Sequence, residues 1–387
     1  MRRQSRIRRR PVMGERNTTD VGLDTSKNSI QVAMLLPGGD KAVEWEIANE
    51  PRAVRRMAKR LKREAVGELR VGYEAGPCGY VLQRQLRELD VNCVVVAPSL
   101  IPVKPGDRVK TNRRDAKKLA VMLRAGALTE VHPPTPEEES VRDLCRCRDD
   151  IREDLIRARH RLGKMLLRRG WTYPGKAWND PHRRWLRNLA LEHDADRAVF
   201  DDYLRAIEHL EERLCAIEIT IEATSHREPY REPVAWLRCF RGIDMVTAMS
   251  LVAELHDFGR FQSARELMSY LGLVPSENST GDRQRRGAIT KTGNKQARRL
   301  LIEASWHYRH KPAVGHKLRK RREGQPGWVI ALADRAQARL HRRYWRLVTH
   351  GKAHNKAVTA VARELSGFLW ATLREHGAAK RSGASVG

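Results

Sequence analysis

Hydrophobic residues between positions 18 and 132 fall in short runs that alternate with stretches of helical spacing. The runs predict five strands, at residues 21–24, 29–36, 43–47, 69–74 and 94–97. Apolar positions three or four residues apart predict three helices, at residues 52–64, 80–89 and 113–124. Strands followed by alternating helices and strands favour an α/β domain with a mixed sheet.

Residues 133–230 carry a helical repeat instead. Thr135 and the acids after Pro136 form a capping-box start. Apolar residues then recur at alternating spacings of three and four, interrupted by Arg148, and the spacing returns after a Trp-, Pro- and Gly-rich break at 170–181. Two such helices predict an antiparallel hairpin or a coiled-coil arm that assembles an oligomer, with a simple spacer as the alternative.

Residues 231–377 are again mainly helical, around a polar, glycine-bearing loop at 275–294. A helix, a turn at Gly242 and a second helix resemble a helix-hairpin-helix, whose turn offers backbone N–H groups to a DNA phosphate. A plain αα-hairpin fits equally well. The helix after the loop places Arg298 and Arg299 away from its apolar face, where we expect a DNA-facing surface.

The net charge of the chain indicates what kind of partner it binds. Its 387 residues predict two or three units. Lys and Arg number 75 against 47 acids, a formal net charge of +28 with a sequence pI near 10.5. Basic residues are spread along the chain, so we expect a nucleic acid as partner. Residues 1–17 and 378–387 are expected to be a disordered basic arm and a disordered tail.

The six cysteines contain no Cys-x-x-Cys pair, which argues against structural zinc and for reduced thiols. No apolar run approaches the length that spans a bilayer, so we expect no membrane partner. Together these features predict a cytoplasmic protein, and the bacterial, nucleoid-associated location that we also expect is implied only by the family resemblance described below.

Acidic residues lie at the ends of predicted strands and helices between residues 18 and 132. Asp24 and Glu74 each end a predicted strand, and Asp115 lies in the first turn of a predicted helix. An acid at a strand end is costly unless it binds something positive, and clustered carboxylates hold Mg²⁺. A pair of such ions activates the oxygens of a phosphodiester displacement. Capping of a turn or helix is the alternative for each acid taken singly.

The loop at 275–294 combines hydroxyls with cations. The hydroxyl side chains belong to Ser276, Ser279 and Thr280. The cations beside them, which we expect to contact DNA, are Arg283, Arg285, Arg286 and Lys291. A serine could attack a phosphate whose charge these cations offset, whereas the residues alone fit a phosphate-binding loop equally well.

Several segments together resemble the Piv/MooV-type DEDD transposases of the insertion sequence one-ten family. Within residues 18–132 these segments are Gly22-Leu-Asp-Thr-Ser-Lys27, Glu74-Ala-Gly76 and Lys110-Thr-Asn-Arg-Arg-Asp-Ala116. Within residues 231–377 they are Gly242-Ile-Asp-Met-Val-Thr-Ala248, Tyr270-Leu-Gly-Leu-Val-Pro275 and Arg286-Gly-Ala-Ile-Thr-Lys-Thr-Gly-Asn294.

The resemblance implies an RNase H/RuvC-like domain at 18–132, a helical coiled-coil arm at 133–230 and a transposase domain at 231–377. It implies Mg²⁺, with Mn²⁺ as a substitute, bound by a tetrad whose third position is Asn112 rather than aspartate, beside Asp24, Glu74 and Asp115. It also implies a serine that attacks DNA, which we assign to Ser279, and a dimer or tetramer guided by a structured noncoding RNA.

Two other functions fit the same residues. A RuvC-type junction endonuclease would use metal-activated water and form no covalent adduct. A non-catalytic, basic RNA-binding protein would not need its acids at all.

Overall fold

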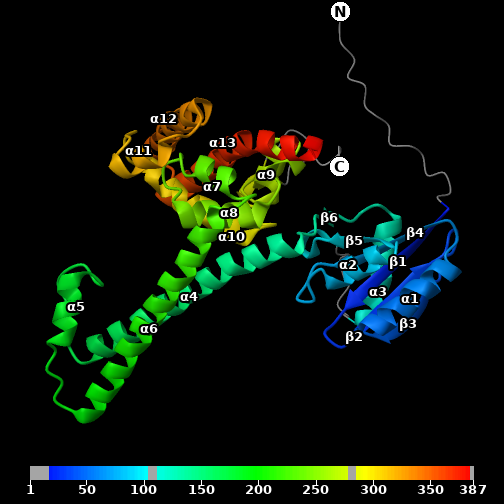
Figure 1. The fold of residues 1–387 in the computed structure, drawn as a ribbon, viewed down its shortest axis with the longest axis horizontal. Helices are drawn as coiled ribbons and strands as arrows, with labels where there is room; N and C mark the ends of the chain where they lie inside the picture. The colour runs from blue at the N-terminus through cyan, green and yellow to red at the C-terminus, as the bar shows by residue number, and fades with distance from the viewer. Residues whose placement is uncertain (1–16, 103–110, 278–284, 384–387) are drawn as a thin grey trace, which may run out of the picture. The chain divides into compact units, whose positions relative to one another are not determined.

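A computed structural model describes residues 17–102, 111–277 and 285–383 (Figure 1). The chain divides into two compact units, Met1–Pro134 and Thr135–Gly387. Each unit has its own hydrophobic core. The two units are described separately below.

The first unit is built on a six-stranded mixed sheet with the order β3-β2-β1-β4-β5-β6. Its strands are β1 (Thr18–Thr25), β2 (Ser29–Leu35), β3 (Val43–Ala48), β4 (Glu68–Glu74), β5 (Asn92–Val96) and β6 (Glu130–Val131). The pairs β1–β4 and β4–β5 are parallel, and the other pairs are antiparallel. The predicted α/β domain with a mixed sheet is therefore confirmed.

Helices cover both faces of this sheet. They are α1 (Pro51–Glu64), α2 (Val81–Glu88) and α3 (Asn112–Arg124), and a 3-10 turn, η1, spans Pro98–Leu100. Side chains alternate along a strand, so β1 presents Val21 and Leu23 to the core shared with α1 and α2. Asp20, Gly22 and Asp24 consequently face the other side, where α3 lies.

The second unit begins with two long helices that pack on each other. They are α4 (Pro136–Arg168) and α6 (Asp194–Ser225), with the short α5 (Asp180–Arg187) between them. Arg148 donates to Glu218 at 2.5 Å, and Arg159 donates to Glu211 at 2.6 Å. Residues later in α4 therefore pair with residues earlier in α6. The two helices are therefore antiparallel within one chain (Figure 1). The predicted capping box at Thr135 is present.

The remaining elements of the second unit form a helical body around one core. Its helices are α7 (Arg231–Leu237), α8 (Met245–Leu255), α9 (Ala264–Tyr270), α10 (Lys295–Ser305), α11 (His316–Arg322), α12 (Gly327–Thr349) and α13 (His354–Gly383), with 3-10 turns η2 (Phe258–Arg260) and η3 (Trp306–Arg309). None of the helices in the described ranges is long and apolar enough to cross a bilayer.

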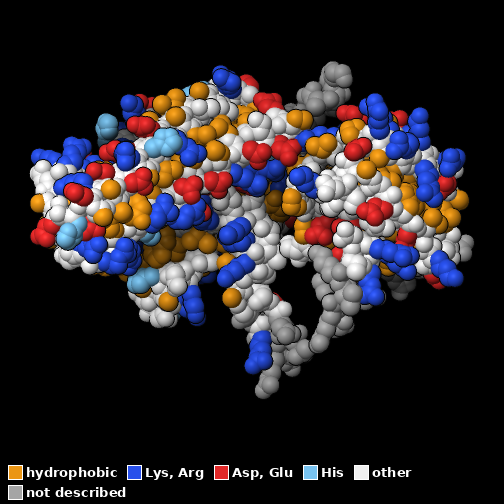
Figure 2. All heavy atoms as spheres, turned by 90° about the horizontal axis from the view of Figure 1, so that it is seen from below, with side chains coloured by type: hydrophobic (Ala, Val, Ile, Leu, Met, Phe, Trp, Pro, Cys, Tyr) orange, Lys and Arg blue, Asp and Glu red, His pale blue; other side chains and the backbone are white. Residues whose placement is uncertain are grey.

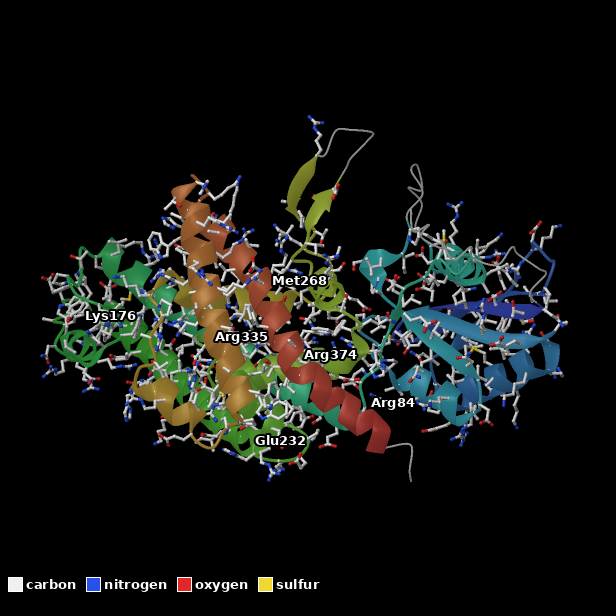
Figure 3. All side chains as sticks on the ribbon, turned by 90° about the horizontal axis from the view of Figure 1, so that it is seen from above. Arg84, Lys176, Glu232, Met268, Arg335 and Arg374 are labelled. Atoms are coloured by element: carbon white, nitrogen blue, oxygen red, sulfur yellow. The ribbon has the colours of Figure 1, made fainter. Side chains whose placement is uncertain are left out.

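The largest departure from the sequence prediction is a hairpin, although β6 was also not predicted and α13 continues to Gly383, past the expected start of the disordered tail at residue 378. The segment predicted as a loop at 275–294 contains an antiparallel hairpin of β7 (Pro275–Glu277) and β8 (Arg286–Ile289). The two strands are too short and too polar to give an alternating pattern, so the sequence offered no strand signal there. Figure 3 shows the hairpin projecting from the helices.

Candidate active site

The position of α3 on the sheet is set by two glycines. Gly22 of β1 and Gly72 of β4 are partners in the parallel register. A Cβ added at Gly22 would lie 2.1 Å from the Ala116 carbonyl oxygen and 2.5 Å from the Ala120 nitrogen. At Gly72 it would meet Leu123 of the same helix at 3.5 Å. Because both glycines lack a side chain, the backbone of α3 rests directly on β1.

This arrangement places two of the predicted acids side by side. Asp24 and Glu74 each follow their glycine by two residues, so both side chains leave the sheet on the α3 face. Leu23 and Tyr73 are register partners, which makes Asp24 and Glu74 the next positions along neighbouring strands. Asp24 is half-buried and Glu74 is exposed.

The first turn of α3 points toward the same end of the sheet. Asn112 and Asp115 share one helix face with Leu119, whose Cβ would lie 2.9 Å from a Cβ at Gly22. At the other end of the helix, Arg124 reaches Asp20 near the start of β1 at 3.5 Å. The helix therefore runs antiparallel to β1, and its N-terminal residues lie toward Asp24. Thr111 caps this turn by accepting a bond from the Arg114 backbone.

Asp20, on the same face of the sheet, is an acid with a structural role. Its side chain is fully buried, with Arg70 at 2.5 Å and Arg124 at 3.5 Å. Arg70 also donates to the Leu123 carbonyl, and Arg124 donates to the carbonyls of Leu36 and Gly39. Neither Glu74 nor Asp115 has such a cation among the described residues.

The donor set at this end of the sheet suits a hard cation. Three carboxylates and the amide oxygen of Asn112 are oxygen donors of the kind that Mg²⁺ prefers. Within the described ranges, however, no three His, Cys, Asp or Glu side chains are close enough to hold an ion. The elements therefore direct Asp24, Glu74 and Asp115 to one end of the sheet without closing a coordination shell.

The predicted nucleophile lies outside the described residues, as do Thr280 and Arg283. The side chain of Arg286 is likewise not described. Ser276 is exposed on β7, and its Oγ would lie 2.4 Å from a Cβ at Gly287 of β8. Arg285 is also exposed. The hydroxyl of Ser276 on β7 and the cation of Arg285, just before β8, thus lie at a projecting hairpin.

The base of this hairpin is tightly held. Gly272 and Gly293 both have positive φ, and a Cβ at Gly293 would lie 1.8 Å from the Tyr270 carbonyl oxygen. Arg298 Nη1 donates to the carbonyls of Leu271 at 2.8 Å and Thr292 at 2.9 Å. These contacts bind the two chain segments that enter and leave the hairpin.

Arg298 consequently does not belong to the predicted DNA-facing surface. It is 9% exposed, and burial lowers the pKa of its guanidinium. Its partners lie before and after the hairpin rather than on its own helix, so helical periodicity could not reveal them. Arg299 is also engaged, with Asp149 of α4 at 2.7 Å and Glu303 at 2.9 Å.

The two other predicted DNA contacts have different surroundings. Lys291 is exposed. Gly242 has φ +84°, and a Cβ there would lie 2.4 Å from the Ala304 carbonyl oxygen. Close packing on α10 therefore accounts for this glycine in the turn between α7 and α8. Its contact with a phosphate stays a prediction.

Sequence reasoning did not single out Glu254, which is buried at the end of α8. Arg146 of α4 donates to both of its oxygens, at 2.7 and 3.0 Å. Asn294, which caps α10, donates to it at 2.7 Å. The available signal was that Glu254 is the single charged residue of the mainly apolar helix 245–255, because a buried carboxylate requires partners.

His256, the next residue along, is also buried. Its backbone has φ 53° and ψ −116°, a region that favours glycine. Burial lowers the pKa of the imidazole to about 4, although Glu138 lies 4.0 Å from Nδ1. The side chain is therefore neutral at pH 7.

Comparison with known proteins identifies the chain. Residues 235–319 match the transposase IS116/IS110/IS902 family, and residues 21–169 match the IS110-type DEDD transposase domain. The chain is 42% identical to putative transposase y4qE of Sinorhizobium fredii, over 92% of this chain and 88% of that protein. It is 37% identical to the transposase for insertion sequence element IS1533 of Leptospira borgpetersenii, over 84% and 95% of the two chains. The chain therefore belongs to the IS110 family of DEDD transposases, enzymes that act on DNA.

Proposed function

We propose that this transposase is a site-specific recombinase that cuts and rejoins DNA strands with a Mg²⁺-binding carboxylate site and a serine nucleophile. The proposal is supported by the register of β1 and β4, which makes Asp24 and Glu74 neighbours, and by the contact of α3 with Gly22, which directs the first turn of α3 toward the same end of the sheet. Asp24, Glu74, Asp115 and the amide oxygen of Asn112 would hold the ion. When bound, Mg²⁺ supplies charge stabilisation to the attacked phosphate.

In this mechanism Ser279 makes the first displacement. Its oxygen forms a bond to phosphorus as one sugar oxygen leaves and takes up a proton. A DNA hydroxyl then displaces the serine in the joining step, so no backbone bond is lost overall. Arg283, Arg285, Arg286 and Lys291 of the hairpin segment would hold the strand and offset phosphate charge.

A polyanionic partner is supported by the +28 charge of the chain. Lys and Arg side chains are scattered across the whole face seen in Figure 2 rather than gathered in one place. We infer that a structured noncoding RNA guides the enzyme and that it works as a dimer or tetramer, with the α4–α6 hairpin as the assembly arm.

The test is a recombination assay with purified protein, Mg²⁺, the DNA that flanks the element and co-expressed RNA. We expect recombined junctions and a covalent protein–DNA adduct on a denaturing gel. Ser279→Ala should abolish the adduct, whereas Ser276→Ala and Thr280→Ala should retain it. Nicked product without an adduct would instead identify a junction nuclease that uses water.

A further inference from the structure

One face of α12 carries a straight row of cations. Arg335, Arg339, Arg342 and Arg346 are spaced four, three and four residues apart, so they fall on one line along the helix. Trp328 lies seven residues before Arg335 and begins the same line. We call these five residues the α12 stripe. Figure 3 marks Arg335 on this helix, which packs beside α13.

The charge of the stripe is not balanced by its surroundings. The helix contains five arginines and a single acid, Asp334, and Arg322 of α11 already pairs with that acid at 2.8 Å. Glu364 of α13 pairs with Arg339 at 2.9 Å. Arg335, Arg342 and Arg346 are exposed and have no acidic partner in the described parts of the chain. Three cations therefore face solvent in one row.

Two exposed indoles accompany these cations. Trp328 is 44% exposed and packs edge-on against Trp236 at 5.3 Å. Trp345 is 43% exposed, and its Nε1 donates to the Arg309 carbonyl at 2.9 Å. Both rings are held in place while keeping a large area in solvent. This face of α12 therefore presents aromatic surface together with its cations.

We propose that the α12 stripe, with Trp345 beside it, binds an unpaired nucleic-acid strand. Arginines in a row follow the phosphates, and a fixed aromatic ring stacks on a base whatever its sequence. The faces of bases inside a duplex are covered by their neighbours, so duplex DNA cannot use the indoles. Trp328 and Trp345 lie about 26 Å apart along the helix axis, the length of about eight stacked nucleotides.

This inference rests on one part of the proposed function, which is that the protein binds nucleic acid. It concerns a surface of the second unit, whereas the proposed metal site lies in the first. Strand binding is measured without cleavage. A finding that Asp24→Asn cleaves DNA normally would overturn the metal site and leave the binding result unaffected.

The experiment measures binding of the full chain to a labelled, unstructured oligouridylate of about 20 nucleotides and to a duplex DNA of equal length, over a range of salt. The triple variant Arg335→Ala, Arg342→Ala, Arg346→Ala should reduce the salt slope of single-strand binding by about 2, because each lost contact contributes about 0.7. Trp345→Leu should weaken single-strand binding roughly 5- to 150-fold, the loss of one stacked base. Duplex binding should respond little to Trp345→Leu.

A matched control removes the same charge elsewhere. Arg161, Lys164 and Arg168 are exposed on one side of α4, and their triple alanine variant also loses three positive charges. We expect it to bind the oligouridylate more tightly than the α12 variant does. Equal weakening by the two triple variants, or no effect of Trp345→Leu on the single strand, would overturn the proposal. Thermal unfolding of each variant checks that the substitutions leave the fold intact, and we expect midpoints close to that of the wild type because these positions are exposed.

Discussion

Gly22 and Ala116 are in backbone contact, so close that any side chain at position 22 would collide with the Ala116 carbonyl at 2.1 Å. The contact fixes where the first turn of α3 lies relative to Asp24. It therefore links a packing requirement to the geometry of the candidate site.

Gly22→Ala should displace α3. We expect a loss of about 1–3 kcal/mol in the free energy of unfolding, because the new Cβ meets backbone that cannot move aside. DNA cleavage should fall as well, since Asp115 moves with the helix. Gly72→Ala is the matched control, because its Cβ would meet only side-chain atoms, at 3.4 Å and beyond. If both variants unfold at the same temperature as the wild type, the backbone of α3 does not contact Gly22 as described.

The acids on the α3 face should separate into two classes. Asp24→Asn and Glu74→Gln should each reduce DNA cleavage by at least about 100-fold through loss of metal binding. Glu74→Gln should change the stability by no more than about 0.5 kcal/mol, because Glu74 is exposed. Mg²⁺ should raise the melting temperature of the wild type but not of Asp24→Asn.

Asp20→Asn should behave in the opposite way. It leaves Arg70 and Arg124 without their buried carboxylate, at a cost of about 3 kcal/mol. The shift in melting temperature with Mg²⁺ should persist in this variant. A large stability loss in Glu74→Gln together with none in Asp20→Asn would reverse the two roles.

Arg298→Met should loosen the hairpin without changing the DNA-facing surface. The buried carbonyl of Leu271 and the partly buried carbonyl of Thr292 lose their donor, and the loss at Leu271 costs about 1–3 kcal/mol. Hydrogen exchange should rise across residues 271–277 and 285–293 and stay unchanged in α6. Lys295→Met, an exposed change on the same helix, serves as the control and should affect neither measurement.

His256 should make the stability depend on pH. Its pKa is about 4 in the folded protein and about 6.5 in the unfolded chain, so the unfolded state binds the proton first as the pH falls. The contribution is fully present above pH 6.5 and decreases toward pH 4, by on the order of 3 kcal/mol. His256→Gly should remove this dependence and suit the backbone at φ 53°. A constant stability difference between the two proteins from pH 7 to pH 4 would contradict the assignment.

Local patterns predicted most of the fold. The apolar runs of the first unit gave strands within a few residues of β1 to β5, because alternation and run length are properties of neighbouring residues. Thr135 and the acids after Pro136 marked the start of α4 for the same reason. Arg148, which interrupts the repeat of that helix, proved to face Glu218 of α6. The placement of Asp24 and Glu74 at strand ends followed from these same strands.

Features that depend on distant partners were not predictable in this way. Arg298 looked like a surface residue because its neighbours Lys295 and Arg299 are polar. Ser305, two turns later on the same line of α10, is fully buried, so the buried face is wider than its apolar residues indicate. Glu254 obtains its partners from residues 108 positions before it and 40 after it. Only the folded chain brings such residues together.

The single carboxylate of Glu254 accepts hydrogen bonds from Arg146 of α4 and from Asn294, which caps α10. A rotation of α4 would pull on Arg146 and, through Glu254, on Asn294 at the start of α10. Two hydrogen-bonded steps therefore connect α4 with the segment that leads from β8, the partner strand of Ser276, into α10.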